Sequence, residues 1–141
     1  MSSRQTFTLA NDLAEISRLA EGVDAFCAPL DPGTKDVMAV QLALEEAVTN
    51  VINHGFDDGQ PHTFTVDLIL EDRRLTAVVS DDAAAYDPLA RPEVDTSVPL
   101  EEREIGGLGV HLVKKLMDSA HYERRDGRNI LTLVRNFAPA A

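Results

Sequence analysis

Hydrophobic residues recur at two different spacings along the chain, and each spacing predicts one kind of element. Two stretches carry an apolar residue every three or four positions, which is typical of an amphipathic helix. The first begins after Asp12 and Glu15, which form a possible capping box, and ends near Pro29. The second runs from about residue 34 to residue 54 and can end at Gly55. Their apolar positions are Leu13, Ile16, Leu19, Val23 and Phe26 in the first stretch and Val37, Val40, Leu44, Val48, Val51 and Ile52 in the second.

Shorter apolar runs separated by turn residues predict strands. The segment "EDRR" divides a hairpin in the middle of the chain, and "DGR" divides a second hairpin near its end. Helical spacing returns between these hairpins, led by the glycine-containing start "IGGLG". The predicted strands cover residues 5–9, 64–70, 75–80, 121–125 and 129–136, and the third helix covers residues 108–119.

The order of these elements predicts the fold class. Strands that are neighbours in sequence usually pair in space, so the sheet should be mostly antiparallel. We therefore expect an α+β fold, a two-layer sandwich with a mostly antiparallel, mixed sheet and about three helices on one face. The 141 residues suit a single domain, 1–141, in which the acidic, proline-containing segment 82–106 is expected to be a flexible lid over a site.

Composition narrows the possible partners. The chain holds 13 Lys and Arg against 24 Asp and Glu, a formal net charge of -11, which repels phosphate backbones and anionic membranes. We therefore expect no direct nucleic-acid or membrane partner, although helix termini can still hold a nucleotide. No apolar run is long enough for a signal peptide or a membrane span, so a cytoplasmic protein is expected. Cys27 lies on an apolar helical stripe and is expected to be a buried hydrophobe.

One stretch of the second helix carries polar residues where apolar ones would fit. In "EEAVTNVINHG", Glu46 and Asn50 are four residues apart and Asn53 continues the row, so their side chains share one face. This strip is either the solvated edge of an amphipathic helix or part of a site that holds an anion or a metal. Spacing alone leaves both interpretations open.

Two further segments offer complementary chemistry. The glycines of "IGGLGVHLVKKL" stand at a helix start, where backbone N–H groups and the helix dipole can hold phosphate oxygens. The alternative is a flexible loop with an ordinary cap. In "VVSDDAAAYDP", Asp81 and Asp82 follow a predicted strand. A buried carboxylate there can accept a hydrogen bond from an exocyclic amine, or it can simply form a turn.

Taken in this order, the segments resemble the GHKL nucleotide-binding superfamily that DNA gyrase and sensor histidine kinases share. "LALEEAVTNVINHG" looks like its N box, "VVSDDAAAYDP" like its G1 box and "EEREIGGLGVHLVKKLMD" like its G2 box, and the likeness continues through "YERRDGRNILTL". It covers nearly the whole chain. The short length, without a phosphoacceptor histidine domain, is closest to the anti-sigma-factor serine kinases of partner-switching systems.

The resemblance implies roles for single residues. Asn50 would ligate Mg²⁺ through its amide oxygen, while the nucleotide phosphates and water supply most other ligands. Glu46 would be the general base that takes the proton of an attacking serine hydroxyl. Asp81 would receive the adenine amino group of ATP, and Thr132 would lie near the same ring.

The resemblance also assigns the phosphate contacts. Arg103, in the lid, would contact a terminal phosphate, unless it is an exposed partner of Glu101 or Glu102. The backbone that holds the phosphates would belong to Gly106, Gly107, Leu108 and Gly109.

The function implied is that of an ATP-binding anti-sigma factor and serine-protein kinase. It would phosphorylate an anti-anti-sigma factor of the STAS type, sequester a sigma factor, and form a homodimer. Two alternatives remain, a protein-binding switch that has lost kinase activity and a stand-alone histidine-kinase-type ATPase domain acting on a separate phosphoacceptor.

One departure from the family pattern bears on ATP binding. The G1 box usually has glycines where this chain has Ala83 and Ala85, and a methyl group there limits positive φ and close approach to a nucleotide. ATP affinity would then be weaker, or the loop would take a different path. His54 and His111 have no partners at zinc-ligand spacing, so no zinc site is expected.

Overall fold

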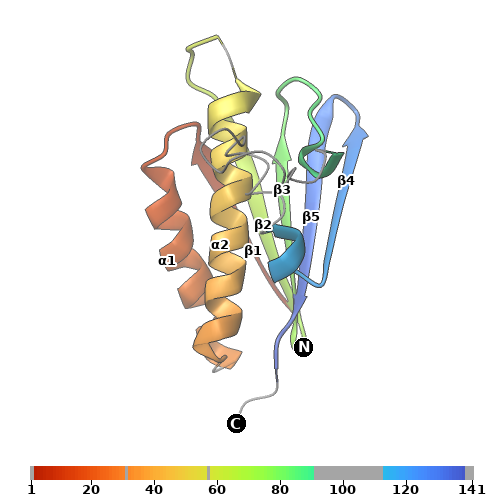
Figure 1. Cartoon of the computed structure of the whole chain (residues 1–141). Coiled ribbons are helices and arrows are strands. Elements are labelled where there is room, and N and C mark those ends of the chain that lie inside the picture. The colour runs from red at the N-terminus through yellow and green to blue at the C-terminus, as the bar shows by residue number, and fades with distance from the viewer. Residues whose placement is uncertain (1, 31, 57, 91–112, 139–141) are drawn as a thin grey trace, which may run out of the picture.

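The protein is built on one antiparallel sheet, seen in a computed structural model that describes residues 2–30, 32–56, 58–90 and 113–138. The strand order is β1-β2-β3-β5-β4, and each of the four neighbouring pairs is antiparallel (Figure 1). The mostly antiparallel sheet that the sequence predicts is therefore confirmed, and no parallel pair occurs among the described strands. Their bounds are β1 Ser2–Ala10, β2 Thr63–Glu71, β3 Arg74–Asp81, β4 Ser119–Arg125 and β5 Arg128–Asn136.

Two helices cover one face of this sheet, so the predicted two-layer α+β sandwich is confirmed (Figure 1). Helix α1 spans Glu15–Cys27 and α2 spans Thr34–Asn50, and α2 continues into one π-helical turn, η2, at Val51–Gly55. Short 3-10 turns lie at Ala28–Leu30 and Pro88–Ala90. Among the described residues, no helix is both long and apolar enough to cross a bilayer.

The third predicted helix, residues 108–119, is only partly described and ends earlier than expected. Residues 113–116 are helical, whereas 108–112 lie outside the described residues. The backbone N–H of Asp118 already donates to the carbonyl of Val134 at 2.8 Å, and β4 begins at Ser119. Pairing with β5 therefore takes over the backbone hydrogen bonds that a longer helix would have used.

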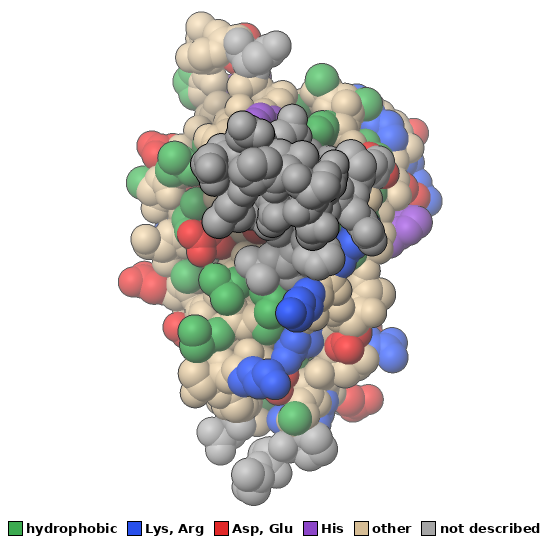
Figure 2. Space-filling view, viewed as in Figure 1, with side chains coloured by type: hydrophobic (Ala, Val, Ile, Leu, Met, Phe, Trp, Pro, Cys, Tyr) green, Lys and Arg blue, Asp and Glu red, His purple; other side chains and the backbone are tan. Residues whose placement is uncertain are grey.

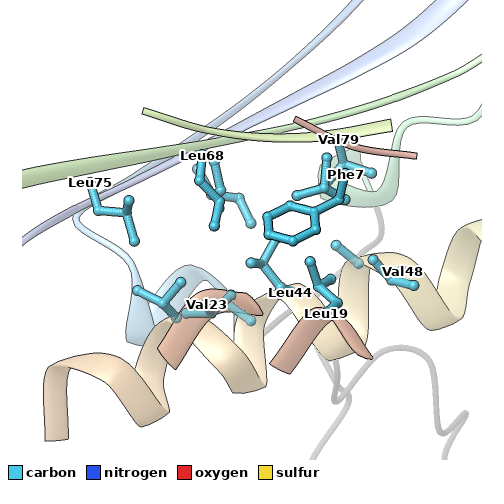
Figure 3. Close-up of a cluster of buried hydrophobic side chains, with 14 of the residues drawn as sticks. Phe7, Leu19, Val23, Leu44, Val48, Leu68, Leu75 and Val79 are labelled. Carbon is cyan, nitrogen blue, oxygen red and sulfur yellow. The ribbon is translucent and has the colours of Figure 1, made fainter. Parts of the chain in front are cut away.

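The core lies between the sheet and the two helices. Side chains alternate along the strands, so that in β2 every second residue is buried, and those of Phe7, Leu68 and Val79 point toward α1 and α2 (Figure 3). Gly22 of α1 lies against Phe7, and a Cβ added there would stand 2.4 Å from the ring. A close approach of α1 to β1 therefore requires glycine at this position.

The second predicted hairpin has the turn that its sequence indicates. Asp126 and Gly127 connect β4 to β5 with φ values of 52° and 77°. Positive φ at both central residues is the condition for a type I′ turn, whose twist matches that of the paired strands.

A buried ion pair joins the start of α2 to the end of β5. Arg135 donates to Oδ1 of Asp36 from Nε at 3.0 Å and from Nη2 at 2.8 Å, and it also donates to the carbonyl of Leu116. The N–H of Ala138 donates to Oδ2 of Asp36 at 3.0 Å. Burial by itself raises the pKa of Asp36, but the Ala138 hydrogen bond and Arg135 outweigh it and hold the pKa below its ordinary value.

Substituting Asp36→Asn should lower the free energy of unfolding by about 3 kcal/mol at pH 7, because it leaves Arg135 half-buried without its counter-charge. A carboxylate with a depressed folded pKa contributes stability above about pH 4, and that contribution is lost as pH falls through the folded pKa. Urea unfolding at pH 7 and pH 3 measures both effects. The difference in the free energy of unfolding between the unsubstituted chain and the Asp36→Asn variant should be smaller at pH 3 than at pH 7.

The matched control is Asp24→Asn, which removes an exposed carboxylate from the last turns of α1. It should change stability by no more than about 0.5 kcal/mol at either pH. A pH-independent loss in Asp36→Asn would contradict the ionic account of this contact.

Candidate functional site

A recess opens where the end of α2 meets the ends of β3 and β5. About 420 Å³ of space in it is free of atoms, part of it continuous with solvent. Its walls are mostly small or aliphatic, including Val79 and Leu131. Its polar side chains are Asn50, Asp81, Tyr86, Tyr122 and Asn129.

Asp81, the last residue of β3, is the buried acid of this recess, with 5% of its surface exposed. Its Oδ1 accepts hydrogen bonds from the N–H of Ala83 at 3.0 Å and from Nδ2 of Asn129 at 2.9 Å. Within the described part of the chain, both hydrogen bonds that this carboxylate accepts go to Oδ1. Oδ2 is therefore the oxygen that can accept a donor from a ligand.

Asn129 organises the recess, and the sequence analysis missed it. Its Nδ2 donates to Asp81 and, at 2.9 Å, to the carbonyl of Ala84. Its Oδ1 accepts the hydroxyl of Tyr122 at 2.5 Å and the N–H of Tyr86 at 3.2 Å. An amide side chain has two donor hydrogens and two acceptor lone pairs, so all four are used within the protein.

Thr132 does not lie at this recess, and the structure corrects that expectation. Leu131 and Leu133 are buried toward the helices, and side chains of a strand alternate between the two faces. Thr132 pairs with Val78 and lies on the opposite face of the sheet from Asp81, which pairs with Asn129. Counting the alternation back from the two leucines would have indicated Asn129 instead.

The loop after β3 shows how alanine replaces glycine in the G1 box. Ala83 is buried, and a Cβ at Gly55 would stand 3.3 Å from its methyl group, so Gly55 leaves room for it. Within the described residues, positive φ in residues other than glycine occurs at Asp72 and Asp126, not in this loop. Arg124 donates from Nη1 to the carbonyl of Ala83 at 2.8 Å. The loop therefore takes a path that alanine can adopt.

Glu46 and Asn50 lie on the last turn and a half of α2, and Asn50 lines the recess. Glu46 is one turn earlier and half-buried, so the two side chains are neighbours on the helix surface. After Asn50 the helix widens into the π-helical turn Val51–Gly55, a distortion that is frequent at functional sites. Asn53, within that turn, is exposed and does not line the recess.

The remaining predicted site residues fall outside the part of the chain that the structure describes. They are Arg103, Gly106, Gly107, Leu108 and Gly109, together with most of the predicted lid and His111.

Cys27, the last residue of α1, is buried, as its position on the apolar stripe predicted. Desolvation by burial, with a smaller effect from Asp24, raises the pKa of its thiol to about 11. Such a thiol is protonated at neutral pH and is a poor nucleophile.

Comparison with known sequences matches this arrangement to one family. The model of the histidine kinase-like ATPase domain matches residues 9–135. The serine/threonine-protein kinase BtrW of Bordetella bronchiseptica is 34% identical over 98 residues, which are 70% of this chain and 69% of that protein. An anti-sigma F factor of Clostridium acetobutylicum is 26% identical over 113 residues, 80% of this chain and 78% of that protein.

Solved structures agree on the fold. The RsbU and RsbW domains of Rv1364c from Mycobacterium tuberculosis match with a TM-score of 0.71 at 16% identity, over 99% of this chain and 34% of theirs. The histidine kinase domain of a blue-light activated histidine kinase from Erythrobacter litoralis matches with a TM-score of 0.53 at 16% identity, over 88% of this chain and 60% of that one. The chain belongs to the histidine kinase-like ATPase family, in the branch that includes serine-protein kinases and anti-sigma factors.

Proposed function

We propose that this protein is an ATP-dependent serine-protein kinase and anti-sigma factor. In this role it phosphorylates a serine of a STAS-type anti-anti-sigma factor, and it sequesters a sigma factor when it is not so engaged. The observation that carries the proposal is the placement of Asn50 and Asp81 in one recess with Glu46 one helical turn away. The names of the relatives, a serine/threonine-protein kinase and an anti-sigma F factor, support it.

Asp81 is the residue that selects adenine in this proposal. Its Oδ2 accepts the exocyclic amino group, while Val79 and Leu131 provide the apolar wall that a flat base requires. Guanine presents a carbonyl at the corresponding position, which a carboxylate repels. Asn129 keeps Oδ1 occupied and so fixes the orientation of the carboxylate.

Glu46 and Asn50 act on the transferring phosphoryl group. Glu46 takes the proton of the serine hydroxyl as the serine oxygen bonds to the γ-phosphorus and the bond from that phosphorus to the ADP oxygen breaks. Asn50 offers an amide oxygen to Mg²⁺, a metal that binds few protein groups and keeps most of its waters. When bound there, Mg²⁺ would supply positive charge that offsets the negative charge of the phosphates. Arg103 and the 106–109 backbone complete the phosphate contacts in this proposal.

The partner-switching role carries further proposals. The chain works in the cytoplasm, where its sigma factor is, and it forms a homodimer as its resemblance to the family implies. Incubation with Mg²⁺, labelled ATP and purified STAS-domain proteins of the source organism tests the activity. Acid-stable phosphoserine on the partner is expected, whereas acid-labile phosphohistidine would favour a histidine-kinase-type ATPase. Failure to bind ATP at millimolar concentration would favour the switch without kinase activity.

Substituting Asp81→Asn should weaken ATP binding about 10- to 100-fold, because an amide hydrogen replaces a charged acceptor that faces the adenine amino group. Isothermal titration calorimetry with Mg²⁺ and ATP measures the change. The control Asp82→Asn alters the neighbouring exposed carboxylate and should leave the affinity unchanged. Equal losses in both variants would remove Asp81 from base recognition.

Substituting Glu46→Gln should reduce the rate of serine phosphorylation by at least about 100-fold, because the amide cannot take the proton. The dissociation constant for ATP should change by less than about threefold. Single-turnover transfer with saturating ATP measures the rate. Glu21→Gln, an exposed site on α1, serves as the control, and unreduced transfer by Glu46→Gln would exclude it as the base.

Substituting Asn50→Ala should instead weaken Mg²⁺-dependent ATP binding by about tenfold, or about 1.4 kcal/mol. Titrations with and without Mg²⁺ separate the metal contribution, since the affinity without metal should change little. Asn53→Ala removes an exposed amide three residues later and should match the unsubstituted chain. A loss that is equal with and without metal would argue against metal ligation by Asn50.

A further inference from the structure

Large hydrophobic side chains are exposed on α2 and in the turn before α1. Among the described residues they are Leu13, Met38 and Leu42, whose exposed fractions are 52%, 51% and 41%. Met38 and Leu42 are four residues apart on α2, so they lie next to each other on the outer surface of that helix. Single exposed apolar residues are common on protein surfaces, but two adjacent ones at the same groove indicate a surface that binds another molecule.

The groove lies between α1 and α2, and about 560 Å³ of space in it is free of atoms, part of it continuous with solvent. Met38, Leu42 and Glu45 line it from α2, and Ile16 and Ala20 line it from α1. Gln41 donates from Nε2 to the carbonyl of Ala20 at 3.0 Å, which ties the two helices together at the groove. Figure 2 shows hydrophobic side chains gathered over this helical layer, with acidic side chains beside them. We call these five lining residues and Gln41 the α1–α2 groove.

The charges around the α1–α2 groove define the partner that it fits. Glu45 is exposed on the groove itself, and Glu21 and Asp24 are exposed on α1. The whole chain carries a formal net charge of -11. An occupant with apolar residues along one side of a helix and Lys or Arg beside them matches both the apolar floor and the acidic surroundings.

The position of the groove connects it to the proposed chemistry. Leu42 precedes Glu46 by four residues on α2, which is a rise of about 6 Å along the helix. A protein that binds at Met38 and Leu42 therefore places the adjoining part of its surface next to Glu46 and Asn50. Solvent-exposed apolar residues one turn from a catalytic base are placed to hold the molecule that brings the attacking hydroxyl.

We propose that the α1–α2 groove is the docking site of the phosphoacceptor protein, which binds through an amphipathic helix flanked by Lys or Arg and so delivers its serine to Glu46. This docking role rests on the proposed kinase function. It separates recognition of the protein substrate, at Met38 and Leu42, from recognition of ATP, at Asp81.

The test is steady-state phosphorylation of the STAS-domain protein that the unsubstituted chain phosphorylates, with Leu42→Asp and Met38→Asp. Each variant should raise KM for the protein substrate at least tenfold, because the apolar contact is lost and a carboxylate would have to be desolvated against the apolar side of the bound helix. The value of kcat and the calorimetric dissociation constant for ATP should stay within threefold. Leu42→Ala should raise KM less, about threefold.

Leu13→Asp is the matched control, because Leu13 is as exposed as Met38 but does not line the groove. It should leave KM unchanged. Circular dichroism and sedimentation of each variant establish that the fold and the oligomeric state are retained.

The outcomes are distinct. An unchanged KM in Leu42→Asp and Met38→Asp, with normal transfer, would overturn the docking proposal and leave the kinase function standing. If these variants instead dissociate a dimer, or release only the sigma factor, the groove belongs to that other partner and the proposal is overturned. No transfer by the unsubstituted chain would overturn the kinase function and this proposal together.

Discussion

Because α1 and α2 bury one face of the sheet, the side chains that alternate toward them must be apolar or must find polar partners. Val79 and Leu131 obey the first condition, and the next inward positions, Asp81 and Asn129, obey the second by bonding to each other. A carboxylate so placed is half satisfied by the protein and presents its other oxygen to the recess. The site is therefore the point at which the core layer passes from apolar to polar.

The elements of this fold were predictable because their signals are local. Helical spacing in α2, the turn residues Asp126 and Gly127, and the alternation in β2 each depend on a few neighbouring residues. The end of the third helix was not predictable, since it depends on a hydrogen bond from Asp118 to Val134, sixteen positions away in β5. The π-helical turn after Asn50 likewise has no signal in the spacing of hydrophobic residues.

The candidate site was predictable in part, for the same reason. Glu46 and Asn50 share a helix and Asp81 ends a strand, so pattern and resemblance together were enough to propose them as site residues. Thr132 was chosen by resemblance without counting which face of β5 it occupies, and Asn129 was missed because its four partners come from β3, β4 and the loop between. Whether alanine fits at position 83 could not be decided from the sequence either, because the space for its methyl group is left by Gly55, which is distant in the sequence.

The side chains of β5 that face the helices, Asn129, Leu131, Leu133 and Arg135, form an inward row that also affects the specificity of strand pairing. Two of its outward neighbours, Ile130 and Val134, are as apolar as Leu131 and Leu133, so the hydrophobic pattern by itself discriminates only weakly against a one-residue slip that would turn the strand over. Asn129 and Arg135 stand at the two ends of the inward row, where one meets Asp81 and the other meets Asp36. A one-residue slip of β5 would remove the partners of both Asp81 and Asp36 at once. These two polar contacts therefore specify the register of the strand as well as the shape of the site.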